Sequence, residues 1–243
     1  MPNIPAIQDL LKSGVHFGHR TERWHPKMKQ YIFGAKKGVH IIDIEQTRSL
    51  LETTLTYVEE LVARGGVILF ISTKPQAQDL IKKYATECGM PYVNGRWLGG
   101  TLTNYKEIQK SVKEYLGLKD QRDKGELKKY TKLEQLRLSR KIEELEGKIG
   151  GITTMKKIPQ AALVLDMRVD KTAVREARNT GVKVIGICDT NVNPNLADFP
   201  IPANDDAIGS LMIITRMFAD AVNAGKSRAK VAPVKTAKQN FKK

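Results

Sequence analysis

The side chains best suited to chemistry form a short run near the N-terminus. Residues 16–29 read HFGHRTERWHPKMK and interleave imidazole and aromatic rings with guanidinium and ammonium groups. Cations neutralise nucleic-acid phosphates and flat rings stack on unpaired bases, so this mixture is typical of RNA recognition. In the alternative interpretation, Phe17 and Trp24 close one end of the hydrophobic core while the charges face solvent. Both interpretations can hold together.

Further basic residues extend this run, and others follow later in the chain. A loop at 95–100, rich in glycine, is typical of backbone that turns tightly or approaches a partner. We expect RNA contacts from residues of the N-terminal run, from this loop and from the helix that follows it: His16, His19, Arg20, Arg23, Trp24, Lys27, Lys29, Lys36, Lys37, Arg96, Trp97, Lys106, Lys110 and Lys113.

Three of the four histidines, His16, His19 and His25, fall within ten residues. A metal site needs three or four convergent ligands, and no Cys-x-x-Cys or His-Glu-x-x-His spacing accompanies these histidines. We therefore predict neither a metal nor any other cofactor.

Acidic residues follow three apolar runs of strand length. Asp166, Asp189, and the pair Asp205 and Asp206 occupy such positions. The carboxyl ends of parallel strands are where α/β folds bind ligands, and grouped carboxylates suit Mg²⁺. Aspartates also cap helices without any metal. No phosphate-binding glycine motif and no Gly-x-Ser-x-Gly motif occurs. A nucleotide- or metal-dependent α/β enzyme is therefore the alternative, and no catalytic residue is predicted.

Strands and helices alternate through most of the chain. Apolar runs of strand length occupy 39–44, 67–71, 161–165, 182–187 and 199–201, with helical periodicity between several of them. The last helix places Ile208, Met212, Thr215, Phe218 and Val222 on one face. This alternation predicts a doubly wound, three-layer α/β sandwich, flavodoxin-like or Rossmann-like, with a mostly parallel sheet.

Residues 105–148 interrupt that alternation. Ile108, Val112 and Tyr115, and later Leu138, Ile142, Leu145 and Ile149, recur at spacings of three and four around a polar joint. Two narrow apolar stripes predict an inserted antiparallel coiled-coil helical hairpin. Its mixed charges fit a solvated decoration or an arm that lies along a phosphate surface.

The distribution of charge supports a division into four parts. The 243 residues carry 41 Lys+Arg against 26 Asp+Glu, a formal net charge of +15. Residues 1–40 carry a net +5, residues 105–148 a net +4 and residues 225–243 a net +7, which leaves −1 elsewhere. We expect a basic N-terminal extension (1–40), an α/β core (41–104 and 149–224), the hairpin (105–148) and a flexible basic tail (225–243). Charge outside the core favours a polyanion as partner over a charged catalytic cleft.

The same composition bounds the cellular setting. Two cysteines cannot make a disulfide framework, and no run of about 18 apolar residues exists to span a membrane. The first residues lack the features of a secretory leader. We expect a cytoplasmic protein that contacts no membrane.

Several longer motifs occur together in one order: IQDLLKSGVHFGH (7–19), RWHPKM (23–28), NGRWLGGTLTN (94–104), PQAALVLD (159–166), VIGICDTN (184–191) and PANDD (202–206). Over residues 4–225 the chain closely resembles the bacterial small-subunit ribosomal protein two family. His25 departs from the family pattern, in which Asn is more usual.

The resemblance implies a structural constituent of the small ribosomal subunit, with no catalytic residue or cofactor. It implies an α/β sandwich with a protruding coiled-coil hairpin, bound to 16S-type rRNA and to neighbouring ribosomal proteins at the head–body junction on the solvent side. It also implies ribosomal protein one as a partner. A homo-oligomer is not expected. A scaffold that binds only proteins is a third hypothesis.

Overall fold

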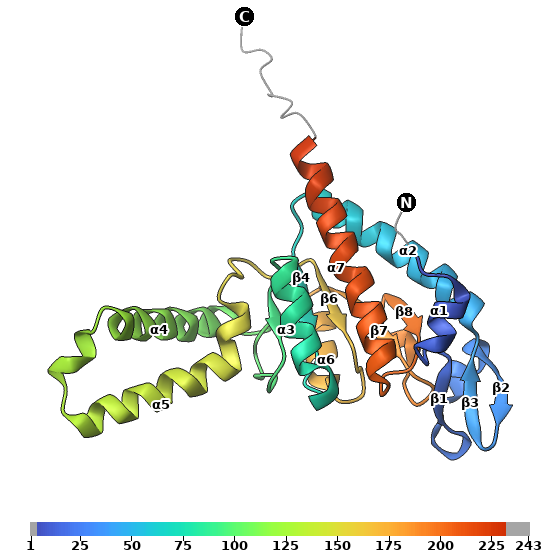
Figure 1. Ribbon diagram of the computed structural model, residues 1–243, viewed down its shortest axis with the longest axis horizontal. Helices are drawn as coiled ribbons and strands as arrows, with labels where there is room; N and C mark the ends of the chain where they lie inside the picture. The colour runs from blue at the N-terminus through green and yellow to red at the C-terminus, as the bar shows by residue number, and fades with distance from the viewer. Residues whose placement is uncertain (1–3, 232–243) are drawn as a thin grey trace, which may run out of the picture.

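The continuous apolar runs form the centre of a parallel sheet, as predicted. The computed structural model describes residues 4–231, in which five strands lie in the order β5-β4-β6-β7-β8 and every neighbouring pair is parallel (Figure 1). The strands are β4 (Ile68–Ile71), β5 (Tyr92–Val93), β6 (Ala161–Val164), β7 (Lys183–Cys188) and β8 (Phe199–Pro202). The direction of strand order reverses between β4 and β6, the position at which such sheets usually bind ligands.

Each face of this sheet has its own hydrophobic core. In β4, Ile68 and Phe70 belong to one core, whereas Leu69 and Ile71 belong to the other. Helices α2 (Ile44–Ala63), α3 (Gln78–Glu87) and α7 (Ile208–Val231) pack on the first core, and α6 (Lys171–Asn179) packs on the second. The protein is therefore a three-layer α/β sandwich, and burial on both faces explains why the strands are apolar throughout.

The N-terminal residues form a second, antiparallel sheet. After helix α1 (Ile7–Lys12), strands β1 (Phe17–Arg20), β2 (Ile32–Lys36) and β3 (Val39–Ile42) lie in the order β1-β3-β2. Lys37 and Gly38 join β2 to β3 with positive φ angles of 51° and 76°, the geometry of a tight two-residue hairpin turn.

This small sheet bears on two predictions. The apolar run 39–44 predicts a strand of the core sheet, but it pairs with β1 and β2 and then enters α2 at Ile44. The expected domain boundary at residue 40 also falls inside β3. The physical reason is the half-buried β3, whose outer residues are too polar for a strand covered on both faces.

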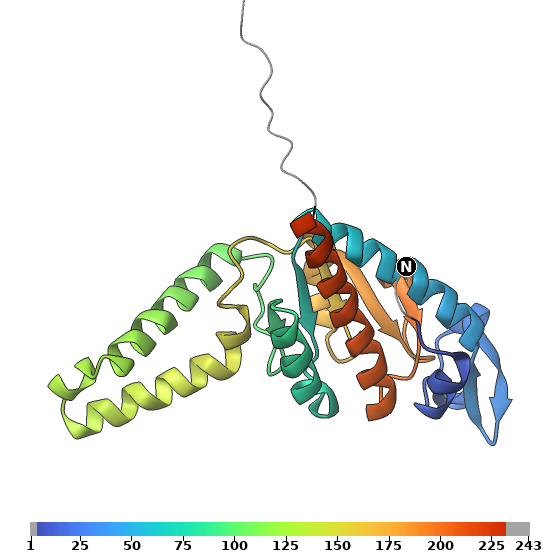
Figure 2. The same ribbon diagram turned by 45° about the horizontal axis from the view of Figure 1, so that its top comes forward.

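Two long helices project from the end of the sheet that carries β5 (Figures 1 and 2). Helix α4 (Tyr105–Asp123) and helix α5 (Lys132–Ile149), with the short turn of helix η4 (Glu126–Lys129) between them, form what we call the α4–α5 arm. Thr131 and Glu134 form a capping box that starts α5. The buried residues of α4 are Ile108, Val112 and Tyr115, the stripe that the spacing predicted.

The last helix differs from its prediction in register and length. Ile208 and Met212 are exposed, whereas Leu211, Ile214 and Phe218 are buried, so only part of the expected face meets the core. The helix continues to Val231, and the first residues of the predicted flexible tail are therefore helical. The remainder of that tail, 232–243, lies outside the described residues.

Among the helices of residues 4–231, none is both long enough and apolar enough to cross a membrane.

Candidate nucleic-acid interface

The predicted RNA-binding residues of the N-terminus lie on and around the β1–β3 sheet. Most have exposed side chains: Arg20, Arg23, Trp24, Lys27, Lys29, Lys36 and Lys37. His16 and His19 are only half-buried. Trp24 leaves 39% of its surface exposed, and its ring lies 5.5 Å from the ring of His40, measured between centroids. An exposed indole among cations is the arrangement that stacking on unpaired bases requires.

His19 faces inward and fastens β1 to the core. Its Nδ1 lies 3.0 Å from an Asp189 carboxylate oxygen, and its Nε2 lies 3.5 Å from an Asp206 oxygen. Its backbone N–H donates to the Thr190 hydroxyl at 2.9 Å. The hydrogen bond to Asp189 raises the pKa of His19, although burial opposes this. The His19 side chain therefore joins β1 of the small sheet to the loops that follow β7 and β8 of the parallel sheet.

The acidic strand ends do meet at one edge, as predicted, but they meet around a lysine. Lys74, three residues beyond the end of β4, places its Nζ 3.1 Å from Asp166, 3.0 Å from Asp205 and 2.6 Å from Asp206. Burial alone lowers the pKa of Lys74, but the hydrogen bonds and charges of these aspartates raise it above its ordinary value. The ammonium stays charged and neutralises part of the cluster.

Asp205 is the buried aspartate of this edge whose pKa is raised furthest by its surroundings. The residue is 1% exposed. Burial, together with the charges of Asp189 and Asp166, raises the pKa of Asp205 to about 7, although Lys74 opposes the shift. A carboxyl group packed among like charges takes up its proton more readily than it does in water.

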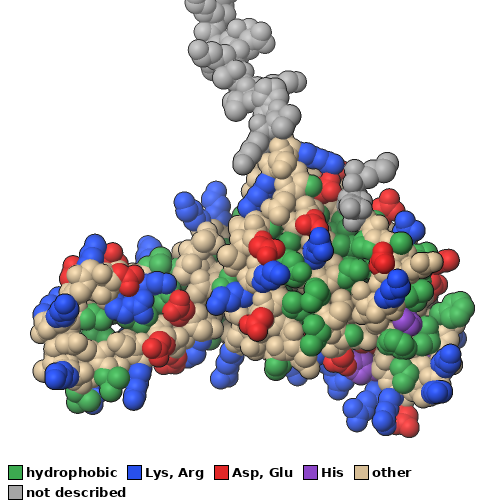
Figure 3. Space-filling view, in the orientation of Figure 1, with side chains coloured by type: hydrophobic (Ala, Val, Ile, Leu, Met, Phe, Trp, Pro, Cys, Tyr) green, Lys and Arg blue, Asp and Glu red, His purple; other side chains and the backbone are tan. Residues whose placement is uncertain are grey.

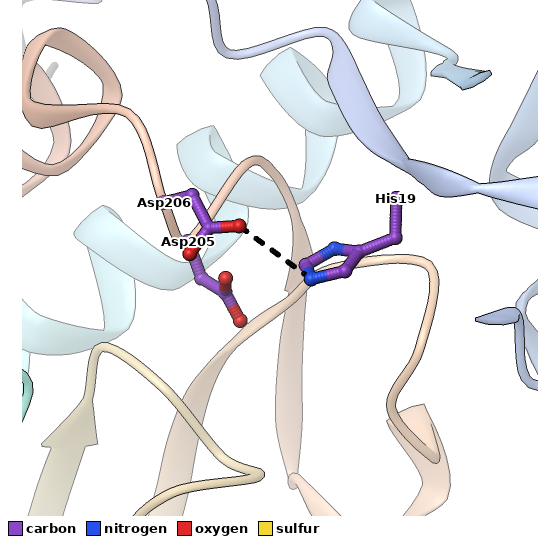
Figure 4. A group of neighbouring side chains, drawn as sticks. All are labelled: His19, Asp205 and Asp206. Carbon is purple, nitrogen blue, oxygen red and sulfur yellow. Dashed lines mark ion pairs between the residues drawn. The ribbon is translucent and has the colours of Figure 1, made fainter.

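One trio in this cluster has the composition of a cation site. Potential ligand atoms of His19, Asp205 and Asp206 all lie within 4.8 Å of one another (Figure 4). A neighbouring cavity of about 570 Å³ is lined by His19, Arg20, Arg23, Asp189 and Asp206, among others. Two of the three candidate ligands already bind Lys74, so a divalent cation here would compete with the ammonium for their oxygens.

The position between β4 and β6, where the strand order reverses and such folds bind ligands, is occupied by a side chain of the protein itself. Asp170 accepts hydrogen bonds from the backbone N–H of Thr73 at 3.1 Å and from its hydroxyl at 2.8 Å. Burial raises the pKa of Asp170 to about 6, although these two bonds oppose it. In doubly wound nucleotide-binding folds, backbone donors at this position hold phosphate. Here a carboxylate of the same chain occupies the donors.

Of the other predicted RNA-binding residues, three lie on α4, in the arm at the opposite end of the molecule from the β1–β3 sheet, and Arg96 and Trp97 lie in the loop before α4, at the root of that arm (Figure 1). Arg96 is exposed, and Trp97 is half-buried with its indole N–H donated to Glu176 at 3.1 Å. Lys106, Lys110 and Lys113 are exposed on α4. The candidate residues thus form two groups, one on the β1–β3 sheet and one on the α4–α5 arm with its root.

Opposite charges on the arm are partly paired with one another. Ion pairs join Lys110 to Glu107, Lys119 to Glu146, Arg122 to Asp123, Lys124 to Asp120, Lys141 to Glu114 and Lys148 to Glu144. Within residues 4–231, Lys106 and Lys113 form no ion pair. Figure 3 shows the Lys and Arg side chains standing out from the arm between acidic ones.

The sequence did not indicate the roles of two residues that organise these sites. Lys74 follows an apolar strand, and the rule that located the aspartates applies equally to it. Glu176 accepts five hydrogen bonds from the loop before α4. Nothing in the sequence around Glu176 indicates this, because its donors lie more than 70 residues away.

Comparison with known proteins adds independent evidence. A family model described as Ribosomal protein S2 matches residues 10–225. The small ribosomal subunit protein uS2 of Aliarcobacter butzleri is 47% identical over 91% of this chain and 84% of its own length. The proteins of the same name from Wolinella succinogenes and Francisella tularensis subsp. novicida are 45% and 46% identical, over 92% and 90% of this chain and 83% and 92% of their own lengths.

These matches agree with the resemblance seen in the motifs, and they leave the enzyme alternative without support, because the family is one of ribosomal structural proteins. A match over most of the chain, with relatives at nearly half identity along most of their own lengths, shows that the chain belongs to the ribosomal protein S2 family.

Proposed function

We propose that this protein is a structural constituent of the small ribosomal subunit in the cytoplasm, where it binds 16S-type rRNA and supports translation. The observation that carries the proposal is the contrast between a core whose buried charges satisfy one another and two exposed basic groups at opposite ends. A rigid body with cations at both ends is suited to bridging separate phosphate surfaces.

We assign the rRNA contacts to these two groups. At the β1–β3 sheet they are Arg20, Arg23, Trp24, Lys27, Lys29, Lys36 and Lys37, with His16 and His19 beside them. At the other end they are Arg96, Trp97, Lys106, Lys110 and Lys113. The exposure of the cations supports this assignment. Among them, Lys106 and Lys113 are the strongest candidates on α4, since no carboxylate of the described residues neutralises them.

The arm fits the proposed role as a coiled coil. Ile108, Val112 and Tyr115 of α4 and Ile142 and Ile149 of α5 belong to the same core. The α4 residues are spaced by four and three and the α5 residues by seven, the spacing of a coiled-coil seam. We propose the division predicted from charge, with the first boundary moved beyond β3: a basic N-terminal part, an α/β core, the inserted arm and a basic C-terminal tail.

The partners would be other ribosomal proteins as well as rRNA. We propose that the protein lies at the head–body junction on the solvent side and contacts neighbouring proteins there, ribosomal protein one among them. The exposed Phe33, Phe17 and Leu11 near the β1–β3 sheet supply apolar surface of the kind that protein contacts use. We propose no homo-oligomer.

Crosslinking in cells, followed by sequencing of the attached RNA, tests this function most directly. We expect reads focused on a few rRNA helices, and co-sedimentation with small subunits that is lost at high salt, because phosphate contacts release counterions. Reads scattered over messenger RNAs would overturn the proposal. Binding that survives nuclease treatment at every salt concentration would instead favour the scaffold that binds only proteins.

A further inference from the structure

The loop 97–103, which leads into the α4–α5 arm, is held by a single carboxylate from another helix. Glu176 lies on α6 and is 7% exposed. One of its oxygens accepts from the indole N–H of Trp97 at 3.1 Å and from the backbone N–H of Gly100 at 2.8 Å. The other accepts from the N–H of Leu102 at 3.0 Å and from Thr103, through its N–H and its hydroxyl, both at 3.2 Å.

Five donors on one carboxylate fix the conformation of the whole loop 97–103. Burial opposes ionisation, but these hydrogen bonds lower the pKa of Glu176, so the carboxylate remains charged. Hydrogen bonds to an ionised acceptor are stronger than neutral ones. Gly100 has a φ of +93°, which strains any residue with a side chain and suits the sharp turn that aims successive N–H groups at one acceptor.

This loop is directly connected to both helices of the arm. The N–H of Asn104 donates to the carbonyl of Gly100 at 2.8 Å immediately before α4 begins at Tyr105. Close to the start of the loop, a Cβ on Gly95 would lie 2.8 Å from the carbonyl oxygen of Gly147 in α5. The roots of α4 and α5 therefore rest on the segment 95–104.

Other contacts also hold the root of the arm: the Gln109 amide donates to the carbonyl of Met155 at 2.9 Å, and a Cβ on Gly151, just after α5, would overlap the backbone of Tyr92 in β5. The Tyr105 hydroxyl donates to the carbonyl of Met155 at 2.6 Å, and Leu102 is buried in the core that also includes Ile108. The arm itself extends away from the sheet (Figure 2). Because the arm is long and is attached at its root, a small change in the conformation of the loop gives a large displacement at the tip of the arm.

We propose that Glu176 is a positioning residue that sets the direction of the α4–α5 arm relative to the sheet. It acts through the loop and needs no contact with RNA. On the proposed function, this direction decides where Lys106 and Lys113 meet the rRNA. The positioning itself is a property of the free protein and can be measured without RNA, so its failure is distinguishable from failure of RNA binding.

The test measures the distance between arm and core by electron–electron double resonance. Spin labels are attached to Lys128→Cys at the arm tip and Arg216→Cys on α7, both exposed positions. The natural cysteines, Cys88 and Cys188, are buried and stay unlabelled in the folded protein. We expect one narrow distance distribution in the parent protein. In Glu176→Ala the distribution broadens and its maximum shifts.

Glu176→Gln keeps the size of the side chain and serves if the alanine variant does not fold. A glutamine has one oxygen and one NH₂ group, so in either orientation one set of donors faces another donor and loses its acceptor. We expect partial broadening and about tenfold faster hydrogen exchange of the Gly100 or Leu102 amides, the change that corresponds to one ordinary hydrogen bond.

Glu143→Gln is the matched control, because Glu143 is an exposed glutamate of α5 with no ion pair among residues 4–231. This control leaves the distribution unchanged. The proposal is overturned if folded Glu176→Ala, with far-ultraviolet circular dichroism like that of the parent, retains the narrow distribution at the same distance. It is equally overturned if Glu143→Gln broadens the distribution as much.

Discussion

Lys74 and Lys113 carry the same ammonium group and serve opposite purposes. Lys74, at the sheet edge, leaves 11% of its side chain exposed and lies within 3.1 Å of three carboxylates. Lys113, on α4, is exposed and forms no ion pair within the described part of the chain. The charge of Lys74 is neutralised by carboxylates within the protein, whereas the charge of Lys113 is free to bind an anion. The net charge of a chain therefore says less about its partners than the number of cations left unpaired at the surface.

The largest effect should come from removing the buried lysine. In Lys74→Met, three aspartates lose their common cation, and breaking a buried charge pair by deleting one partner costs about 3–5 kcal/mol. We expect the free energy of unfolding, measured by urea titration, to fall by that amount.

Arg64→Gln is the control for Lys74→Met. Arg64 pairs with Glu60, but their side chains are 80% and 56% exposed, so the loss should stay below about 1 kcal/mol. A Lys74→Met variant as stable as Arg64→Gln would show that the sheet edge does not depend on its lysine.

A second test uses the pH dependence of stability. The native pKa values of Asp205 and Asp170 are raised to about 7 and about 6, and that of His19 is raised as well. Groups with raised native pKa values bind protons more tightly when folded, so their stabilisation is complete at low pH and is lost as the pH rises through the native pKa. We expect the free energy of unfolding to fall by about 2 kcal/mol or more between pH 5 and pH 8.

Carboxylates with lowered pKa values, such as Glu176 and Asp206, lose their stabilisation only below about pH 4 and do not obscure this window. Urea midpoints at several pH values measure the change, and Asp205→Asn should flatten it. Stability that rises from pH 5 to pH 8 would contradict the arrangement described at the sheet edge.

The exposed cations of the arm should affect binding and leave stability nearly untouched. In the double variant Lys106→Ala and Lys113→Ala, we expect the plot of log binding constant against log salt concentration to lose roughly 0.7–0.9 in slope for each phosphate contact removed. The unfolding free energy should stay within about 0.5 kcal/mol of the parent value.

Filter binding to a small-subunit rRNA transcript at several salt concentrations measures that slope. Lys82→Ala with Lys83→Ala removes the same charge from the exposed face of α3 and is the control. Equal loss of slope in both variants would show that charge alone, and not its position on the arm, governs binding.

The comparison also explains what the sequence could predict. The runs 67–71, 161–165 and 182–187 are apolar because both faces of each strand are buried, and this pattern is local. The closeness of the acidic residues follows from a general rule, because the carboxyl ends of parallel strands lie at the same edge of a sheet. Lys74 at their centre did not follow, because its contact with Asp205 joins residues 131 positions apart. Pairing partners of buried charges are decided by tertiary structure, which spacing along the chain does not encode.

Weaker patterns failed for related reasons. The N-terminal sheet has strands such as FGHR at β1, whose residues are half-buried or exposed and show no apolar alternation. In α7, Ile208 and Met212 fit the helical period but lie at the exposed start of the helix. The RNA-binding residues stay a prediction, although their exposure and their separation into two groups now direct which variants to make.

The smallest effect should come from a surface ion pair that lies between the two extremes. Lys141 of α5 pairs with Glu114 of α4, and both side chains are about half exposed. In Glu114→Gln we expect a stability loss below about 1 kcal/mol, because exposed pairs gain little from water-screened attraction. The same change frees the charge of Lys141, so the salt slope of rRNA binding should steepen by at most roughly 0.9, the value for one added phosphate contact.

Glu126→Gln also removes one negative charge near the arm tip without breaking an ion pair of the described residues and is the control. A loss well above 1 kcal/mol in Glu114→Gln alone would mean that the pair holds the arm together, and that Lys141 belongs with Lys74 among the cations used inside the protein.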